Sequence, residues 1–306
     1  MMKPARLQKG DTIGVIAPSG PVNMEKLHKA IPFFEKLGLH VQLGQHIEEK
    51  NGYLAGTDEQ RLADLHEMIA DKNIKAIIFA RGGYGAGRIA SDIDYNLVRN
   101  NPKIIWGYSD ITYLHTAFHQ ATGLVTFHGP MLASDISQDD FDELSGRMFE
   151  QLFEPTKLCY SEKSSPLCVR VSGEAEGELV GGNLSLLVST IGTPYEIDTK
   201  GKIILLEDIG EEPYRVDAML NQLKLSGKLA EATGIVVGDF AESEPKVEKP
   251  SLTMEQVFHD YLDKLNIPVI SGFKIGHCLP HFSVPLGVHA KLSSSKKTLT
   301  VDAGVE

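Results

Sequence analysis

The feature that most constrains the fold is an alternation of short apolar runs and amphipathic helical patterns along the first half of the chain. Residues 12–20, 74–80 and 103–109 are apolar runs that end in turn residues, and residues 24–39 and 58–71 carry apolar side chains at helical spacing. Strands that are apolar throughout and alternate with helices are typical of a parallel sheet covered on both faces. The first half therefore predicts an α/β domain.

The second half of the chain has a different pattern. Residues 154–178 are polar and rich in turn residues, which is typical of a junction between domains. We therefore expect one domain over residues 1–155 and a smaller one over residues 172–306. The second domain is predicted to be mixed α/β, with a helix in 181–192, a strand in 202–208, a helix in 213–227, a strand in 234–240, a polar loop in 242–251 and a hairpin in 288–302.

Composition limits the class of ligand. The 306 residues include 41 acidic and 30 basic ones, so the formal net charge is −11. Because no Lys/Arg block stands out, we expect no nucleic-acid and no membrane partner, but a small molecule or a peptide. No apolar stretch approaches the ~20 residues that a membrane span needs. Three cysteines at no metal-like spacing suit a reducing compartment, so we expect a cytoplasmic protein.

Three loops follow apolar runs of the first half, at residues 17–22, 80–88 and 107–112. In open parallel sheets, ligands gather beyond the carboxyl ends of the strands. The second loop, ARGGYGAGR, contains four glycines, whose backbone N–H groups can turn toward an anion or a developing oxyanion. Its spacing matches neither the dinucleotide fingerprint nor a Walker loop. A plain tight turn explains these glycines equally well.

Ser109 stands where the third apolar run gives way to a helical pattern. A serine at such a junction is commonly an N-cap, and Asp110 would then favour the helix dipole. The stretch GYSDI also resembles a nucleophile elbow without its second glycine, which would make Ser109 a nucleophile and the N–H of Asp110 an oxyanion donor. Both interpretations fit the local pattern.

A nucleophilic serine needs a base, and the chain offers eleven histidines. His115 and His119 lie four residues apart on the helix that Ser109 opens, where positions in the core or on the surface explain them best. His128 lies in a motif, TFHGPM, that could reach the same rim.

His277 follows a glycine, just after the short strand pattern of residues 268–276. This places His277 in a loop that could point into a cleft. A metal held by His277, Cys278 and His281 is a weak hypothesis, because no second cysteine cluster accompanies them.

Glu207 is the best candidate for the acid that orients the base. It stands where a buried strand is predicted to end, so its carboxylate would be partly desolvated and held by rigid backbone. Glu211 and Glu212 precede Pro213 at a predicted helix start, where capping explains them better.

Seven motifs resemble, in order and in separation, those of the L,D-carboxypeptidase family of serine peptidases, whose members also include microcin C immunity peptidases. The motifs extend from about Asp11 to about Gly287 and read GDTIGVIAPSGP, ARGGYGAGRI, WGYSDIT, FHGPM, GGNLSLL, LLEDIGEEPYRVDAML and GFKIGH. The resemblance implies a flavodoxin-like α/β N-terminal domain that carries the serine. It also implies a smaller C-terminal domain that carries a glutamate and a histidine, with the site between the two.

The motifs carry these roles to individual residues of this chain. The resemblance implies a catalytic triad of Ser109, Glu207 and His277, and an oxyanion hole made by the N–H groups of Gly83 and Asp110. No metal and no organic cofactor are required, and a homodimer is expected from the family.

The resemblance also points to a substrate from cell-wall turnover, a muropeptide tetrapeptide that loses its terminal D-alanine. Recognition of the carboxylate of this D-alanine requires a fixed cation or a cluster of N–H groups. Arg81 and Arg88 are candidates, with Tyr84 as a lid contact. A salt bridge on a solvated face is the alternative for either arginine.

Two other functions are compatible with the sequence. An immunity-type peptidase that cuts a peptidyl or aminoacyl nucleotide would use the same chemistry and differ in the rim and in the loop around residues 240–255. A protein of another class, a non-catalytic binder, would hold a small anion on the glycine loop, but a binder needs no triad.

Overall fold

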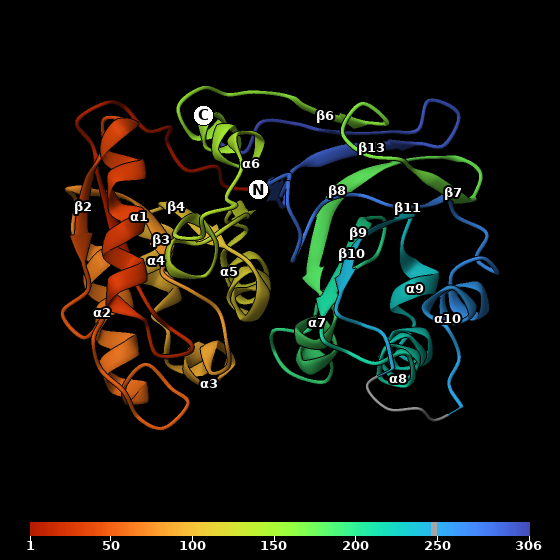
Figure 1. Cartoon of the computed structure of the whole chain (residues 1–306), viewed down its shortest axis with the longest axis horizontal. Coiled ribbons are helices and arrows are strands. Elements are labelled where there is room, and N and C mark those ends of the chain that lie inside the picture. The colour runs from red at the N-terminus through yellow and green to blue at the C-terminus, as the bar shows by residue number, and fades with distance from the viewer. Residues whose placement is uncertain (246–249) are drawn as a thin grey trace.

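The computed structural model describes residues 1–245 and 250–306. It contains two β-sheets with their helices, which lie side by side (Figure 1). The predicted polar loop at 242–251, and with it the wider loop at 240–255, includes residues 246–249, which lie outside the described residues. Within the described ranges, each helix is too short or too polar to cross a membrane.

The first sheet is parallel except at one edge, as the alternation of patterns predicts. Its strands lie in the order β2, β1, β3, β4, β5 and β12, and only β12 is antiparallel to its neighbour. The order 2-1-3-4-5 is that of flavodoxin-like folds, so the expected fold class is confirmed. The strands are β1 (Thr12–Ile16), β2 (His40–Leu43), β3 (Ile74–Phe79), β4 (Ile104–Gly107), β5 (Thr126–His128) and β12 (Val284–Leu286).

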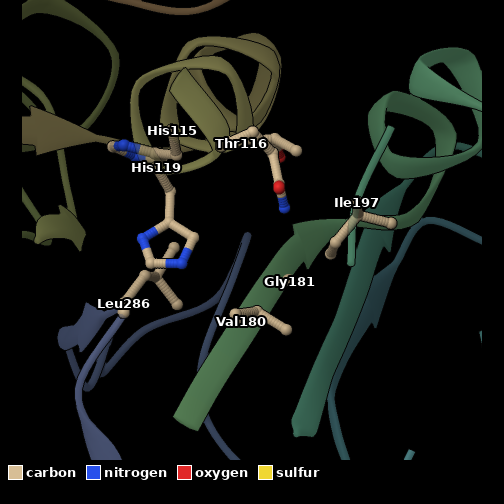
Figure 2. Close-up of a pocket in the computed structure, with 9 residues that line it drawn as sticks. His115, Thr116, His119, Val180, Gly181, Ile197 and Leu286 are labelled. Atoms are coloured by element: carbon tan, nitrogen blue, oxygen red, sulfur yellow. The ribbon is translucent and has the colours of Figure 1, made fainter. Parts of the chain in front are cut away.

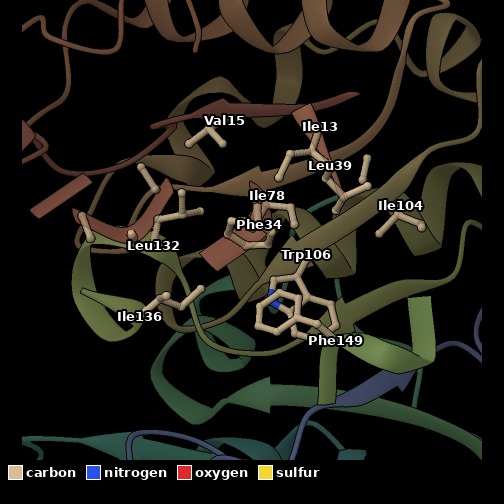
Figure 3. Packing of buried hydrophobic residues seen from close by; sticks show 14 of the residues in the cluster. Ile13, Val15, Phe34, Leu39, Ile78, Ile104, Trp106, Leu132, Ile136 and Phe149 are labelled. Carbon is tan, nitrogen blue, oxygen red and sulfur yellow. The ribbon is translucent and has the colours of Figure 1, made fainter. Parts of the chain in front are cut away.

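Two apolar clusters cover the two faces of this sheet, because successive strand residues point to opposite faces. Ile104 and Trp106 belong to one cluster, and Ile105 between them belongs to the other. In the first cluster the ring of Trp106 stacks on Phe149 with 4.2 Å between centroids (Figure 3). The helices of this half are α1 (Met24–Lys36), α2 (Asp58–Ala70), α3 (Ala86–Ile89), α4 (Tyr95–Asn100), α5 (Thr112–Thr122) and α6 (Glu143–Arg147).

Side-chain caps fix where α1 and α2 begin. Oδ1 of Asn23 accepts a hydrogen bond from the N–H of Lys26 at 3.1 Å, and Thr57 forms a capping box with Gln60. Each such cap stabilises a helix by about 1 kcal/mol. The two caps therefore fix where the loop after β1 ends and where α2 begins.

The second sheet is mixed and has eight strands in the order β6, β14, β13, β8, β9, β10, β11 and β7. Strands β8 to β11 are parallel, and antiparallel strands flank them. The predicted hairpin is confirmed as the pair β13 and β14. The strands are β6 (Leu158–Ser161), β7 (Cys168–Val171), β8 (Glu174–Asn183), β9 (Ile203–Ile209), β10 (Gly234–Ala241), β11 (Val269–Ser271), β13 (His289–Ser293) and β14 (Thr298–Val301).

The predicted helices of the second half are α7 (Leu184–Thr190) and α8 (Pro213–Leu225). Two further helices, α9 (Lys228–Glu231) and α10 (Met254–Tyr261), have no counterpart in the sequence prediction. One face of α8 is apolar: Val216, Leu220 and Leu223 are buried in the cluster that this helix shares with the sheet, and Met219 packs against it.

Two features depart from the sequence pattern. Residues 158–183, which overlap the polar stretch, form strands β6, β7 and β8. The first half of β8 alternates exposed and half-buried residues, so it lacks the apolar run of a central strand. In addition, β12 lies late in the chain but pairs with β5 of the first sheet, so the two sheets are not built from two uninterrupted stretches.

Candidate active site

The loops that follow β1, β3 and β4 meet at one edge of the first sheet. The N–H of Gly20 donates to the carbonyl of Gly82 at 3.3 Å. Gly82 in turn packs against Ser109, since a Cβ atom on residue 82 would lie 3.1 Å from Oγ. A glycine at position 82 therefore lets the loop backbone lie directly beside the serine hydroxyl.

Ser109 has a φ of 63°, a conformation that residues other than glycine rarely adopt. It is the first residue of a 3-10 turn (Ser109–Ile111) that leads into α5, and within the described ranges no side chain caps the start of this turn. The N-cap interpretation of Ser109 is therefore wrong. Strain of this kind costs about 1–3 kcal/mol, and a strained strand-to-helix turn is the geometry of a nucleophile elbow.

The side chain of Asp110 is buried and points into the protein. Its Oδ2 accepts a hydrogen bond from the N–H of Ala86 at 2.8 Å, which ties the glycine loop to the serine turn. Burial raises the pKa of Asp110, although hydrogen bonds and the charge of Arg61 act in the opposite direction. The carboxylate thus holds the glycine loop.

Gly83 has a φ of 125°, and a Cβ atom there would lie 3.2 Å from the Cα of Gly20. This position requires glycine for both its conformation and its close approach to the loop after β1. The plain-turn interpretation of the glycine loop accounts for the conformation but not for the contacts that Gly82 and Gly83 make with two other loops.

Glu207 and His277 form a hydrogen-bonded pair. Glu207 lies on β9 and is fully buried, and its Oε2 is 2.8 Å from Nδ1 of His277. Burial alone lowers the pKa of His277, but the carboxylates around it, Glu207 above all, raise it above its ordinary value. The sequence prediction that an acid at the end of this strand would hold the imidazole agrees with this geometry.

Tyr108 connects this pair to the serine turn. Its ring centroid lies 4.7 Å from that of His277, and its hydroxyl donates to Oδ1 of Asp135 at 2.7 Å. Since Tyr108 immediately precedes Ser109, the ring of His277 packs against the residue next to the serine. Sequence reasoning missed Tyr108 and Asp135, because an aromatic residue beside a serine carries no signal of its own.

Two further histidines contact the ring of Tyr108. His128 and His281 are buried, and both rings contact the ring of Tyr108. Burial lowers the pKa of His128, and lowers that of His281 to about 3, which favours the neutral form of both rings. His128 is fully buried, so the prediction that it could reach the rim is wrong. Among the described residues, no group of three or more His, Cys, Asp or Glu side chains is placed to hold a metal ion.

The three residues considered for substrate binding differ in their partners. Arg88 forms an ion pair with Asp58 at 2.7 Å, which is the surface salt bridge considered as the alternative. Arg81 instead donates to the carbonyls of Gly82 at 3.1 Å and Pro21 at 3.2 Å. Tyr84 is 57% exposed, and its ring packs edge-on against another tyrosine.

A small cavity lies where α5 meets β8. Figure 2 shows the lining residues His115, Thr116 and His119 on α5 and Val180 and Gly181 on β8. Its volume of about 20 Å³ is enough for about one water molecule and not for a peptide. Beside it, Nε2 of His119 pairs with Oε1 of Glu178 at 2.5 Å, so this region joins the two halves.

Two family models match the chain. Residues 13–129 match the LD-carboxypeptidase N-terminal domain, and residues 176–292 match the LD-carboxypeptidase C-terminal domain. A probable murein peptide carboxypeptidase of Bacillus subtilis (strain 168) is 56% identical over 303 residues, which cover 99% of this chain and 95% of the relative.

Two solved structures extend this similarity to three dimensions. An MccF-like protein from Bacillus anthracis superposes with a TM-score of 0.88 at 31% identity, covering 99% of this chain and 100% of the other. The muramoyltetrapeptide carboxypeptidase from Oxalobacter formigenes superposes with a TM-score of 0.84 at 31% identity, covering 95% and 98%. Both halves of the chain, with the serine turn and the Glu207–His277 pair, thus fall within the matched regions.

Proposed function

Because the chain belongs to the LD-carboxypeptidase family, we propose that it is a serine L,D-carboxypeptidase that releases the terminal D-alanine of a muropeptide tetrapeptide during cell-wall recycling. Relatives with 56% and 31% identity carry the names murein peptide and murein tetrapeptide carboxypeptidase, which supports this substrate class. The observation that carries the mechanism is the 2.8 Å bond between Glu207 and His277, whose ring packs on Tyr108, the residue before the strained Ser109.

In the proposed mechanism, Oγ of Ser109 attacks the carbonyl carbon of the terminal amide and passes its proton to Nε2 of His277. The C–N bond then breaks, and His277 delivers the proton to the departing amine of D-alanine. Water hydrolyses the acyl-enzyme by the same route. Positioned proton transfer of this kind contributes about 10²–10⁴-fold to the rate.

Glu207 keeps the Nδ1–H tautomer of His277 and stabilises the imidazolium that forms at each step. The N–H groups of Gly83 and Asp110 are proposed to stabilise the negative charge on the carbonyl oxygen. An oxyanion donor of this type is worth about 10²–10³ in kcat. The close packing of Gly82 on Ser109 supports a position for these donors beside the hydroxyl.

Arg81 is the proposed partner for the carboxylate of D-alanine. Its guanidinium is held by two carbonyls and lines a cavity of about 280 Å³ that also includes Lys26. A neighbouring cavity of about 530 Å³ is lined by Arg81 and Lys50. Neither lining includes an acidic residue, so an anionic peptide would be attracted here. Arg88 is engaged by Asp58, and the exposed Tyr84 is left as a contact at the rim.

The MccF-like neighbour favours one alternative, an immunity-type peptidase that cleaves a peptidyl or aminoacyl nucleotide with the same residues. A non-catalytic anion binder is less well supported, because burying Glu207 against His277 serves no purpose in a binder. We further propose that the protein acts as a cytoplasmic homodimer without a cofactor, with no nucleic-acid or membrane partner.

The test is to incubate the purified protein with a panel of muropeptides and an aminoacyl adenylate analogue and to identify products by mass. Release of D-alanine from a tetrapeptide, but not of L-alanine from its diastereomer, is expected. Ser109→Ala should reduce the rate by about 10⁴-fold or more. Unchanged release by this variant would refute the serine mechanism, and cleavage of the adenylate alone would favour the immunity-type activity.

A further inference from the structure

We propose that Arg61, together with Asp110, positions the glycine loop so that its N–H groups face the reacting carbonyl oxygen; this inference rests on the proposed function. Arg61 lies on α2, outside the three loops that form the site. Its side chain is fully buried, which is rare for an arginine that does not serve a specific contact.

The guanidinium of Arg61 joins two of the three loops. Nη1 donates to the carbonyl of Pro18, in the loop after β1, and to the carbonyl of Gly85, in the glycine loop, at 2.8 Å. Nη2 pairs with Asp58 at the start of α2, which anchors the guanidinium to its own helix. A rigid, planar group therefore bridges the two loops, in addition to the Arg81–Pro21 and Gly20–Gly82 hydrogen bonds.

The glycine loop needs such a restraint. Gly83 and Gly85 have φ values of 125° and 127°. Glycine can adopt such values but also many others, so the glycines alone do not hold the backbone in this conformation. Besides the ion pair of Arg88 and the bond from Arg81 to Pro21, three hydrogen bonds hold the loop: at Gly82 from the N–H of Gly20, at Gly85 from Arg61, and at Ala86 to the carboxylate of Asp110. Gly83, the proposed donor, lies between the first two.

Asp110 completes the arrangement. Its carboxylate, buried near the charge of Arg61, binds the N–H of Ala86 at 2.8 Å, and its own backbone N–H is the second proposed donor. The glycine loop is thus held by two buried side chains of opposite charge, Arg61 and Asp110. Arg61 touches no reacting atom in this scheme, so it is a positioning residue.

The experiment compares Arg61→Met and Arg61→Lys with Arg170→Met. Arg170 is a matched control, because it is also a buried arginine that holds two carboxylates, at 2.7 and 2.8 Å, but it lies in the second half away from the glycine loop. For Arg61→Met, kcat for D-alanine release should fall about 10- to 100-fold with KM within about threefold, since a displacement near 1 Å costs up to 10²-fold. Arg61→Lys should recover part of the loss.

A second readout does not depend on the substrate. A fluorophosphonate probe should modify Ser109: Oγ bonds to phosphorus, fluoride leaves, and the proton passes to His277. The phosphonyl oxygen takes the place of the oxyanion, so the labelling rate should fall with kcat in Arg61→Met and in Asp110→Asn. Thermal melting identifies any variant that fails to fold. If Arg61→Met does not fold, the labelling rates of Arg61→Lys and Asp110→Asn test the positioning role.

The two proposals fail in different ways. If the wild type labels at Ser109 but releases no D-alanine, the substrate is wrong and the labelling rates still test Arg61. If folded Arg61 variants keep the kcat and labelling rate of Arg170→Met, the positioning role is wrong although the peptidase stands. A rise in KM with unchanged kcat in Arg61→Met would also refute the positioning role.

Discussion

Gly276 presents its backbone to the carboxylate of Glu207: a Cβ atom on residue 276 would lie 2.6 Å from Oε2, the oxygen that binds His277. The φ of Gly276, 123°, is one that a side chain strains. Glycine therefore lets the histidine loop come close enough for the bond to form.

Replacing Gly276 by alanine should separate the pair. We expect Gly276→Ala to lower kcat by at least about 10-fold, because the base loses its orientation, and to cost about 1–3 kcal/mol of stability. Kinetics and thermal melting measure the two effects. Gly201→Ala is the matched control, since Gly201 also has a positive φ, 70°, but open space around it. Equal kcat values for the two variants would show that the contact with Glu207 is unimportant.

The pH profile should report the pair directly. His277 accepts a proton only when it is neutral, and its pKa is raised, so kcat/KM should climb with pH through a midpoint above the ordinary value of about 6.5. Glu207→Gln removes the charge that raises this pKa and leaves the burial that lowers it. The midpoint should move to lower pH while kcat falls about 10³- to 10⁴-fold.

Glu211→Gln provides the comparison for this profile. Glu211 pairs with Arg215 just beyond the same strand, so its loss removes a carboxylate without touching His277. Its midpoint should coincide with that of the wild type. If the midpoint of the rise in kcat/KM does not move in Glu207→Gln, a group other than His277 is responsible for that rise.

The cavity beside Arg81 leads to a prediction about affinity. Arg81→Met should raise KM for the tetrapeptide by about 10-fold, in line with the loss of one hydrogen bond to a charged group, and should leave kcat nearly unchanged. Arg88→Met should change KM little, because Arg88 is 45% exposed and paired with Asp58. Initial rates over a range of substrate concentrations distinguish the two. If Arg81→Met and Arg88→Met changed KM equally, the carboxylate of D-alanine would not bind at Arg81.

The sequence was sufficient for the parallel sheet of the first half and for Glu207 at the end of a buried strand, because apolar runs and helical spacing are local signals. It was not sufficient for Arg61, which looks like any arginine on an amphipathic helix until the fold buries it against the carbonyls of Pro18 and Gly85. The first half of β8 was missed for a related reason, since its polar residues face out of a sheet that only long-range pairing creates.

The loop that carries His277 is attached to both halves of the molecule. The residue range 272–283 leaves β11 in the second sheet and enters β12 in the first, where β12 pairs with β5. Any relative movement of the two sheets therefore also pulls on this short segment. The alignment of the imidazole is consequently tied mechanically to the spacing of the two sheets, and the first half expressed alone would lack both the edge strand and the base.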